Sequence, residues 1–412
     1  MSSKKIVIVG GGAAGYFAAI QAATTNPSAQ VIILERGKDV LQKVKISGGG
    51  RCNVTHACFI PRDLTKNYPR GERELMSPFN KFATGDTIDW FEKHGVELKI
   101  EDDGRMFPVT DKSQTIIDCL VNAALDAGVL LQRGFRVDDI QIAENQQIIL
   151  KAMQQKDIVA DSVIIATGST PSFWEILKRI GHTIVEPVPS LFTFNIKDAR
   201  IAELAGLSVP MASVEMSGSK IQTNGPLLVT HWGLSGPAVL KFSAWGAREL
   251  SEKAYQCTIN VNWRGIYTQA ETIEELNDAK LENPRQQPVS NPQCGIPTRL
   301  WKTLCEAAGV TKEQNWADLN KKTIQALAMQ ITDCQFVVNG KSTFKEEFVT
   351  AGGVSLKEVD FKTFESKIHK NLFFAGEVLD IDAVTGGFNF QAAWSGGFIA
   401  GGAAAVSSLN PS

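Results

Sequence analysis

The sequence lacks an excess of charge of either sign. Its 412 residues include 42 lysines and arginines against 44 aspartates and glutamates, so the formal net charge at pH 7 is −2. Proteins that bind nucleic acid or anionic lipid through charge need a clustered basic field, and the composition shows none. We therefore expect no nucleic-acid and no membrane partner, and any role on RNA would have to rest on a local surface.

Cysteine pairs are also missing. The seven cysteines are odd in number and widely spaced, and none of them forms a Cys-x-x-Cys motif. This pattern argues against a disulfide framework, a zinc knuckle and a dithiol redox centre, and no metal site is predicted. The closest two, Cys52 and Cys58, are expected to be ordinary thiols rather than a redox couple.

Long uninterrupted hydrophobic runs are absent as well. The apolar residues 6–9 have only the length of a strand and run into glycines, unlike a signal peptide. No charged residue follows Asp382, but the last stretch carries Asn389, Gln391 and Ser395. A membrane span needs about 20 predominantly apolar residues. A buried, close-packed helix is therefore expected there, and the protein is expected to be soluble and cytoplasmic.

The sequence is long, and it is slightly rich in glycine. Single hydrophobic cores stop growing near ~250–300 residues, so the length predicts at least two domains. The shares of hydrophobic residues, 43%, and of charged residues, 21%, are those of an ordinary globular protein. The 35 glycines slightly exceed the usual share of about 7%, and many of them lie in clusters.

The first glycine cluster lies between predicted elements of a dinucleotide-binding unit. A short β-branched strand is predicted at 4–9, an alanine-rich helix at 16–24, and a second strand at 31–34 that ends at Glu35. Glu35 follows the last glycine of the cluster by 20 residues, the spacing at which a carboxylate binds a ribose diol. An acid there disfavours a 2′-phosphate, so FAD or NAD is preferred over NADP. Arg36 beside it is included among the expected cofactor contacts.

Within this cluster, G-x-G-x-x-G falls on Gly10, Gly12 and Gly15. The first glycine makes the turn, the second lets the backbone approach a pyrophosphate, and the third lets helix and strand pack closely. Ala13 and Ala14 begin the helix, whose N-terminus supplies partial positive charge to the phosphates.

A second glycine cluster, at 48–50, is flanked by cations. Three successive glycines leave bare N–H groups that can face a flat or anionic ligand, and Lys45 and Arg51 can balance its charge. The expected cofactor contacts in this segment are Lys43, Lys45, Ser47, Gly49, Gly50, Arg51, Cys52 and Asn53.

Two later segments are expected to reach the same cofactor. A buried strand at 163–165 ends in the small residues Ala166, Thr167 and Gly168, and in two-dinucleotide-domain flavoproteins such a turn passes close to FAD. Val137, placed in the preceding strand, is where the backbone would meet the adenine.

Near the C-terminus the chain returns to the first domain. A strand at 371–377 is predicted to end in Gly376 and Glu377, and this acid could bind a ribityl hydroxyl. Gly386 and Gly387 then open the C-terminal helix and could aim N–H groups at the flavin N1/C2=O edge, which becomes negative on reduction. Phe388 and Asn389 are included in this part of the expected site.

The segment between these parts has a different composition. Short strands are predicted from about 191 to 264, and charged helices from about 271 to 335. No second strand, G-x-G-x-x-G and helix unit occurs here, as a dedicated nicotinamide domain would require. The insertion is therefore interpreted as a substrate-side or lid domain.

These blocks together resemble the BaiN/YhiN-like family of NAD(P)/FAD-dependent oxidoreductases, also described as aminoacetone oxidase-like FAD-binding enzymes. The motifs are G-G-G-A-A-G at 10–15, K-x-x-x-S-G-G-G-R-C-N at 43–53, T-H-x-G-x-S-G-P at 230–237, T-A-G-G-V at 350–354, A-G-E-x-x-D-x-D at 375–382 and T-G-G-F-N at 385–389. Phe388 stands where tyrosine is commoner in this family and so lacks a phenol hydroxyl group, and Phe364 stands where methionine is commoner. If relatives use that hydroxyl group to bind substrate, the substrate choice of this chain is open.

The resemblance implies an α/β fold with a discontinuous, glutathione-reductase-type Rossmann FAD domain at 1–190 and 346–412. It also implies an inserted β-rich subdomain at 191–270 and a helical subdomain at 271–345, with the flavin ring at their junction.

The leading interpretation is an FAD-dependent oxidoreductase that transfers hydride through flavin N5 on an unidentified small organic substrate, with NAD(P)H as electron donor. The candidate substrate-side groups are His231, Asp380 and Asp382, because histidine titrates near neutrality and carboxylates can exchange protons. The alternatives are an oxygen-using small-amine oxidase, an RNA-modifying flavoprotein and a non-catalytic flavoprotein.

Overall fold

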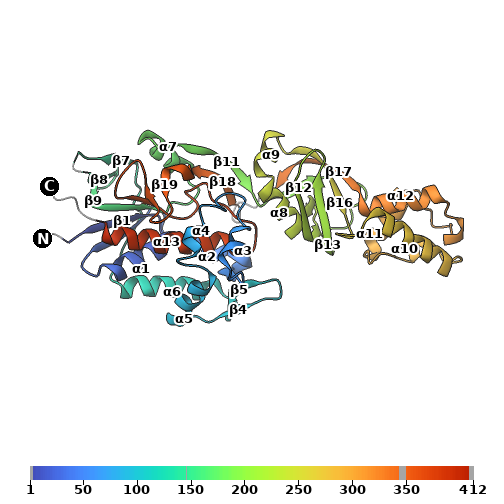
Figure 1. Cartoon of the computed structure of the whole chain (residues 1–412), viewed down its shortest axis with the longest axis horizontal. Coiled ribbons are helices and arrows are strands. Elements are labelled where there is room, and N and C mark those ends of the chain that lie inside the picture. The colour runs from blue at the N-terminus through green and yellow to red at the C-terminus, as the bar shows by residue number, and fades with distance from the viewer. Residues whose placement is uncertain (1–2, 145, 343–348, 408–412) are drawn as a thin grey trace. The chain divides into compact units, whose positions relative to one another are not determined.

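The computed structural model describes residues 3–144, 146–342 and 349–407. The chain divides into two compact units, both drawn in Figure 1. The first unit combines Met1–Val188 with Val349–Ser412, and the second unit is Pro189–Phe348. The chain therefore leaves the first unit and returns to it after a long insertion. The predicted end of this insertion, at residue 345, lies outside the described residues.

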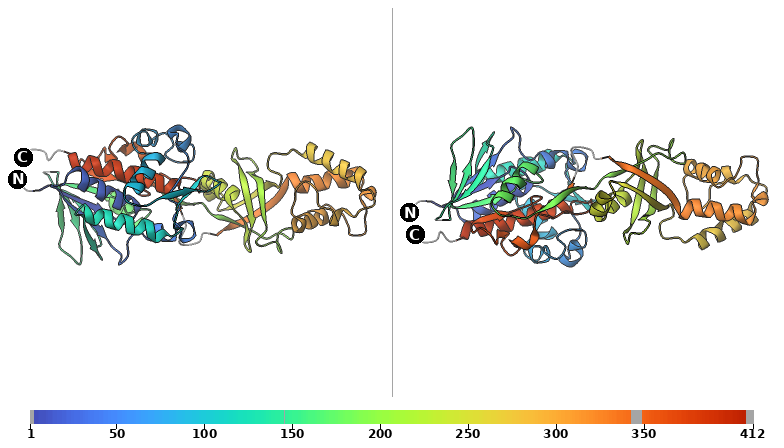
Figure 2. Two further views of the ribbon diagram at one scale, coloured as in Figure 1. Left: turned by 90° about the horizontal axis from the view of Figure 1, so that it is seen from below. Right: turned by 90° about the horizontal axis from the view of Figure 1, so that it is seen from above.

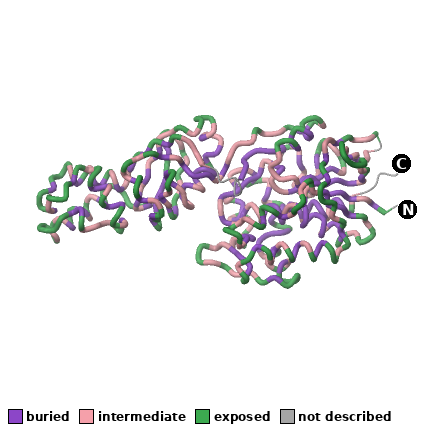
Figure 3. Tube along the Cα trace, turned by 180° about the vertical axis from the view of Figure 1, so that it is seen from behind, coloured by how far each residue is buried: buried purple, intermediate pink, exposed green. Residues whose placement is uncertain are grey.

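A seven-stranded sheet lies at the centre of the first unit, in the order β19-β20-β21-β10-β1-β2-β6. Its strands are β1 (Lys5–Val9), β2 (Gln30–Glu35), β6 (Leu130–Arg133), β10 (Ser162–Ile165), β19 (Val359–Asp360), β20 (Glu365–Ser366) and β21 (Leu372–Phe374). From β21 to β6 the strands run parallel, and Val9 pairs with Leu34 on one side and Ile165 on the other. The buried apolar runs of β1, β2, β10 and β21 suit the interior of a parallel sheet, whereas β6 at its edge is mostly exposed. Figure 3 shows how buried and exposed residues are distributed along the chain. The predicted α/β Rossmann-type fold is confirmed.

Helix α1 (Ala13–Thr25) and the C-terminal helix α13 (Phe388–Val406) pack side by side in this unit (Figures 1 and 2). A Cβ atom built on Gly397 would lie 2.6 Å from the Ala14 carbonyl oxygen, and one on Gly401 would lie 2.3 Å from that of Ala18. Glycine lets the two backbones approach this closely. The uncharged C-terminal stretch is thus a buried core helix, as predicted.

None of the helices in the described ranges combines the length and the apolar character needed to cross a membrane.

Smaller elements complete the first unit. They are α2 (Gln42–Gly50), β3 (Thr55–His56), α3 (Pro61–Thr65), α4 (Met76–Phe79), α5 (Thr84–Lys93), β4 (Leu98–Ile100), β5 (Arg105–Pro108), α6 (Ser113–Asp126), β7 (Asp139–Ile142), β8 (Ile148–Lys151), β9 (Ile158–Ala160), α7 (Pro171–Arg179), β11 (Ile184–Ser190) and β18 (Val349–Val354). Val137 was predicted to lie in a strand. It lies instead in the connection between β6 and β7, because the strand ends before Gly134, although its side chain is buried.

The second unit contains a closed barrel in the order β12-β15-β14-β13-β16-β17. Its strands are β12 (Thr193–Ile196), β13 (Ser208–Met216), β14 (Gln222–Val229), β15 (Gly233–Ser235), β16 (Gln256–Asn262) and β17 (Cys334–Ser342). Its helices are α8 (Pro237–Trp245), α9 (Ala247–Glu252), α10 (Gln269–Glu282), α11 (Thr298–Ala307) and α12 (Lys321–Thr332). A continuous hydrophobic core, which includes Phe194, Trp263 and Trp301, runs through barrel and helices.

Two details of the second unit differ from the prediction. Residues 237–252, expected among short strands, form α8 and α9. The predicted helical subdomain at 271–345 also contains β17, which pairs with β12 and β16 and so belongs to the barrel.

Candidate functional site

The glycine turn between β1 and α1 contains glycines with two different tasks. A Cβ atom on Gly10 would lie 2.4 Å from the Ala166 carbonyl oxygen, and one on Gly15 would lie 2.0 Å from that of Gly10. These two positions exclude any side chain because the neighbouring backbones are packed against them. At Gly12 a Cβ atom would have no heavy atom within 4 Å. Gly12 therefore faces open space at the carboxyl end of a parallel strand, where dinucleotides bind in such folds.

The start of α1 also offers hydrogen-bond donors. Gly10 N lies before the helix and donates to Leu34 O. The hydrogen bond from Tyr16 N to Gly12 O is at the start of the helix. The described residues supply no acceptor for the N–H groups of Gly12, Ala13 and Ala14. Unpaired N–H groups at a helix N-terminus form a ready site for a phosphate oxygen.

Glu35 is held in place by the backbone of the turn it faces. One carboxylate oxygen accepts from Gly11 N at 2.8 Å, and the other accepts from Gly37 N at 2.7 Å. An ionised carboxylate has about four acceptor positions, so two of them remain for a hydroxyl group. Arg36, the next residue, is exposed.

The second glycine cluster is a left-handed loop at the end of α2. Gly48, Gly49 and Gly50 have φ values of 57°, 68° and 84°, a run that only glycine adopts without strain. A Cβ atom on Gly49 or Gly50 would meet nothing within 4 Å, whereas one on Gly48 would lie 2.9 Å from the Phe107 ring. The loop is thus fixed at Gly48 and presents bare backbone at the next two residues.

Cys52 anchors the far end of this loop. Its side chain is fully buried, and its N–H donates to Ser47 O at 3.0 Å. Burial raises the pKa of the Cys52 thiol to about 12, so it is a neutral thiol near pH 7. All seven cysteines are free.

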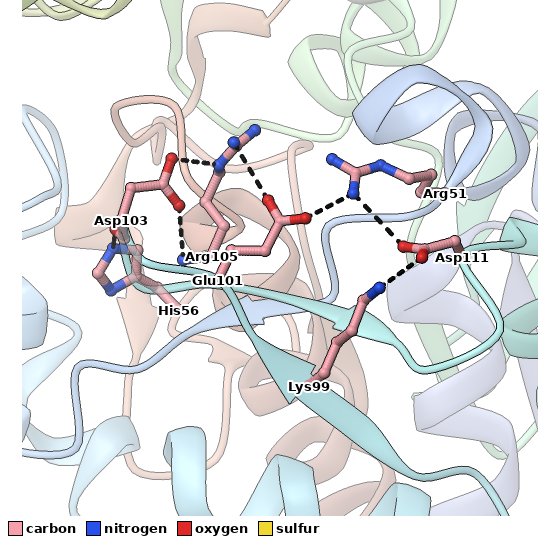
Figure 4. A network of polar contacts seen from close by, with 7 residues as sticks. All are labelled: Arg51, His56, Lys99, Glu101, Asp103, Arg105 and Asp111. Carbon is pink, nitrogen blue, oxygen red and sulfur yellow. Dashed lines mark hydrogen bonds and ion pairs between the residues drawn. The ribbon is translucent and has the colours of Figure 1, made fainter.

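The cations around the loop are mostly engaged with carboxylates. The Arg51 guanidinium donates to Glu101 at 2.6 Å and to Asp111 at 3.4 Å (Figure 4). These carboxylates share the charge of Arg51, so its contact with a ligand stays a prediction. Lys43 forms an ion pair with Glu377, and Lys45 is exposed.

Glu377 lies beside a small cavity. The strand β21 stops at Phe374, so this acid is in the turn after the strand rather than at its end, because pairing with β10 covers only Leu372–Phe374. A Cβ atom on Gly168 would lie 3.7 Å from its carboxylate. The residues that line the cavity are Phe364, Gly376, Glu377, Leu379, Ile381, Asn389 and Ala392.

Thr167 has a buried hydroxyl group that finds no hydrogen-bond partner among the described residues. It follows Ala166, which is also buried, and precedes Gly168, whose φ of 61° is left-handed. Buried hydroxyl groups nearly always form a hydrogen bond, so a bound molecule that supplies the missing partner would explain this one.

The N-terminus of α13 is only partly open. With the Asn53 amide oriented to satisfy both of its groups, its oxygen accepts from Gly387 N at 3.0 Å and its nitrogen donates to Thr55 O at 3.0 Å. The expectation that Gly387 aims a free N–H at a ligand is thus corrected. The described residues offer no acceptor to the N–H groups of Phe388 and Asn389, the first two of the helix.

Two side chains predicted to contact the cofactor here have structural partners. Phe388 is buried, and its ring stacks on His56 with 4.6 Å between centroids. Asn389 accepts from Ala383 N at 3.0 Å and donates to Ala383 O at 3.2 Å, which closes the turn before the helix. Gly386 is buried beside Phe388, where a Cβ atom would lie 2.8 Å from that ring.

The candidate acid–base residues lie in different environments. Asp382 is fully buried and forms a two-pronged ion pair with Arg70. Asp380 is half-buried, and its backbone N–H donates to Val354 O at 3.1 Å. His231 is exposed in the turn between β14 and β15 of the second unit.

Sequence reasoning missed a buried polar cluster at the start of α13. The Gln391 side-chain oxygen accepts from Thr55 at 2.6 Å and from Thr87 at 3.0 Å, and its nitrogen donates to Ser395 at 3.0 Å. Gln391 is fully buried. A polar residue in an otherwise apolar helix was the available signal, whereas no spacing rule could identify its threonine partners.

The described residues contain no group of three or more histidine, cysteine, aspartate or glutamate side chains that could hold a metal ion.

The chain matches the family described as HI0933-like protein Rossmann domain over residues 4–403. It is 28% identical over 378 residues to a ribosomal RNA dihydrouridine synthase of Escherichia coli strain K12, covering 89% of this chain and 90% of that protein. It is 27% identical over 399 residues to a 3-dehydro-bile acid delta(4,6)-reductase of Clostridium scindens, covering 94% of this chain and 96% of that protein.

Among solved structures, the fold is similar to that of a 3-ketosteroid-delta4-(5alpha)-dehydrogenase from Rhodococcus jostii RHA1. The TM-score is 0.52 at 14% identity, and the match covers 99% of this chain and 98% of that chain.

Proposed function

The chain belongs to the HI0933-like Rossmann family of FAD-dependent oxidoreductases, and we propose that it reduces a carbon–carbon double bond conjugated to a carbonyl group, with NAD(P)H as electron donor. In this reaction the double bond gains a hydride, which comes from NAD(P)H, and a proton. A cytoplasmic location belongs to the proposal, because NAD(P)H is available there and seven free cysteines suit a reducing compartment.

The observation that carries this proposal is the similarity to two relatives over about nine-tenths of their length or more. Their names refer to substrates of very different size, an RNA nucleotide and a bile acid. The chemistry they name is the same, because the uracil ring and a 3-oxo-Δ4,6 steroid both contain a double bond conjugated to a carbonyl group. We take this shared bond type as the substrate feature of the present chain.

The residues of the first unit fit FAD. The unpaired N–H groups at Gly12, Ala13 and Ala14 would hold the pyrophosphate, and Glu35 would bind the ribose diol. The open backbone at Gly49 and Gly50 leaves room for a ligand that a side chain would fill.

The other predicted contacts would extend this site. Val137 would lie near the adenine, and Glu377 and the unpaired hydroxyl of Thr167 would bind polar groups of the cofactor.

When bound, FAD supplies hydride transfer at its N5 atom. The chain must hold the substrate and deliver the proton. Asp382 is unsuited to proton delivery because it is fully buried and paired with Arg70. We therefore assign proton delivery to Asp380, which is half-buried in the first unit and whose carboxyl group can exchange a proton. His231, in the second unit, stays a prediction from the sequence.

A small enone is the first substrate class to test, because the nearly balanced charge of the chain gives no overall positive field to attract RNA. Uridine in RNA is the second candidate, favoured by the name of the Escherichia coli relative.

Anaerobic reduction of the FAD-loaded protein tests the proposal. NADH or NADPH should bleach the flavin band at about 450 nm, and a 3-oxo-Δ4,6 steroid or a uridine-containing ribosomal RNA fragment should restore it. Bleaching by a small amine such as aminoacetone, but not by NAD(P)H, would replace the proposal with the oxidase alternative. Absence of reduction by every donor would favour a non-catalytic flavoprotein.

A further inference from the structure

Arg51 is the residue directly after the left-handed loop Gly48–Gly50, and its side chain contacts Glu101, Asp111 and Phe107. Figure 4 shows the two carboxylate contacts. Its guanidinium donates to Glu101 Oε1 at 2.6 Å and to Asp111 Oδ1 at 3.4 Å, and it stacks on the Phe107 ring at 3.9 Å. The hydrogen bond that Arg51 donates to Glu101 is the largest cause that raises the pKa of Arg51, and Asp111 adds to it, so the charged form is favoured.

The carboxylates that hold Arg51 are themselves held by two other cations. Glu101 also accepts from Arg105 at 3.3 Å, and Asp111 forms an ion pair with Lys99. Lys99 lies on β4 directly opposite Phe107 on β5. Lys99, Arg105 and Phe107 therefore project from an antiparallel pair of strands, whose backbone is more rigid than that of a loop.

Asp103 belongs to the same network but does not contact Arg51. It pairs with Arg105 at 2.7 Å and is exposed. It thus provides a matched comparison, since it is a carboxylate at the rim of the network with no contact to the residue beside the loop.

The loop needs an external restraint. Glycine loses more backbone freedom on ordering than any other residue, so three successive glycines do not fix their own conformation. Contact with Phe107 restrains Gly48, and burial of Cys52 restrains the chain beyond the loop. Arg51 lies between these points, next to Gly50, whose neighbourhood is otherwise open.

We infer that Glu101 and Asp111 are positioning residues for the flavin cofactor: they hold Arg51 and so fix the Gly48–Gly50 loop in the form that receives it. They also neutralise the positive charge of Arg51 beside the site. This inference rests on the proposed function, because it requires that the loop contacts FAD.

The test compares Glu101→Gln with Asp103→Asn. Each substitution removes one negative charge from the connection between β4 and β5. Loss of a charged hydrogen bond to Arg51 should raise the Kd of the apo-protein for FAD about tenfold in Glu101→Gln. The midpoint potential of the bound flavin should also rise, because an Arg51 guanidinium that has lost one of its two carboxylate partners is less neutralised and favours the more negative, reduced form. Asp103→Asn should change neither quantity. Flavin fluorescence titration measures the Kd, and dye equilibration measures the potential.

Equal Kd and equal potential in the two variants would overturn the inference. Failure of the wild-type protein to bind FAD would instead refute the proposed function, so the two failures are distinguishable. Should Glu101→Gln fail to fold, Arg51→Lys serves as the second variant, because it keeps the charge and loses the forked donors. It should raise the Kd for FAD, and an unchanged Kd would overturn the inference as well.

Discussion

Gly12 and Gly15 lie three residues apart in one turn and are glycine for different reasons. Gly12 has extended backbone angles, φ −92° and ψ −170°, and open space around its Cβ position, whereas a Cβ atom on Gly15 would collide with Gly10 O. Gly12→Val should therefore abolish FAD binding while lowering the unfolding free energy of the apo-protein by only about 1 kcal/mol, the cost of valine at a helix N-cap. Gly15→Ala should lower it by about 3 kcal/mol.

Urea denaturation of the apo-protein and flavin absorbance after desalting measure the two effects. A Gly12→Val protein that keeps its full yellow colour would contradict the assignment of the pyrophosphate site.

Cys52 should make the stability of the protein depend on pH. Burial raises the pKa of its thiol from 9.0 to about 12, which outweighs the lowering effect of its hydrogen bond with Ser47. The unfolded thiol ionises first as pH rises, so the stabilisation is fully present below about pH 9 and is lost progressively toward pH 12. Cys52→Ala should therefore lose less stability than the wild-type protein between these two pH values, as measured by urea denaturation. An identical decline in both proteins would show that this thiol does not contribute.

At the scale of elements, the sequence predicted best what is local. The unit formed by β1, α1 and β2 was predicted because strand, glycine turn, helix and acid follow one another within about thirty residues. The strand β17 was missed, although Cys334–Val338 alternates between buried and exposed side chains, because its partners β12 and β16 are distant in the chain. The end of β21 was also missed, since an apolar run does not show where pairing stops.

The packing of α13 against α1 predicts opposite effects for two adjacent glycines. A Cβ atom on Gly401 would lie 2.3 Å from Ala18 O, whereas one on Gly402 would meet only the flexible Gln21 side chain, at 3.8 Å. Gly401→Ala should therefore lower the unfolding free energy by about 1–3 kcal/mol through overpacking. Gly402→Ala should raise it by about 0.4–1 kcal/mol, because alanine reduces the freedom of the unfolded chain.

Chemical denaturation of both variants measures the difference. Equal stabilities would show that the two helices do not pack as closely as their backbones indicate.

At the scale of the whole molecule, the candidate site draws on segments that lie far apart in the chain. Its glycine positions could be predicted because each cluster carries its own local signature. The ion pairs around it could not, since Arg70 pairs with Asp382 across 312 positions and no spacing rule relates them. The ion pairs of Arg51 could not be predicted either. A cation beside a glycine loop suggests an anionic ligand, and the sequence does not show whether carboxylates of the protein contact that cation.

The charge of the whole molecule separates the two candidate substrate classes. With 42 basic and 44 acidic residues, the chain has no overall positive field to attract phosphates. A protein that makes 6–10 phosphate contacts loses about 10³–10⁵ in affinity between about 50 and 200 mM salt. We expect retention of ribosomal RNA by this protein to be weak and to fall by less than about tenfold over that range. Filter binding of labelled RNA at several salt concentrations measures the slope. Tight retention with a steep slope would reveal a clustered basic surface and would make uridine in RNA, rather than a small enone, the leading substrate.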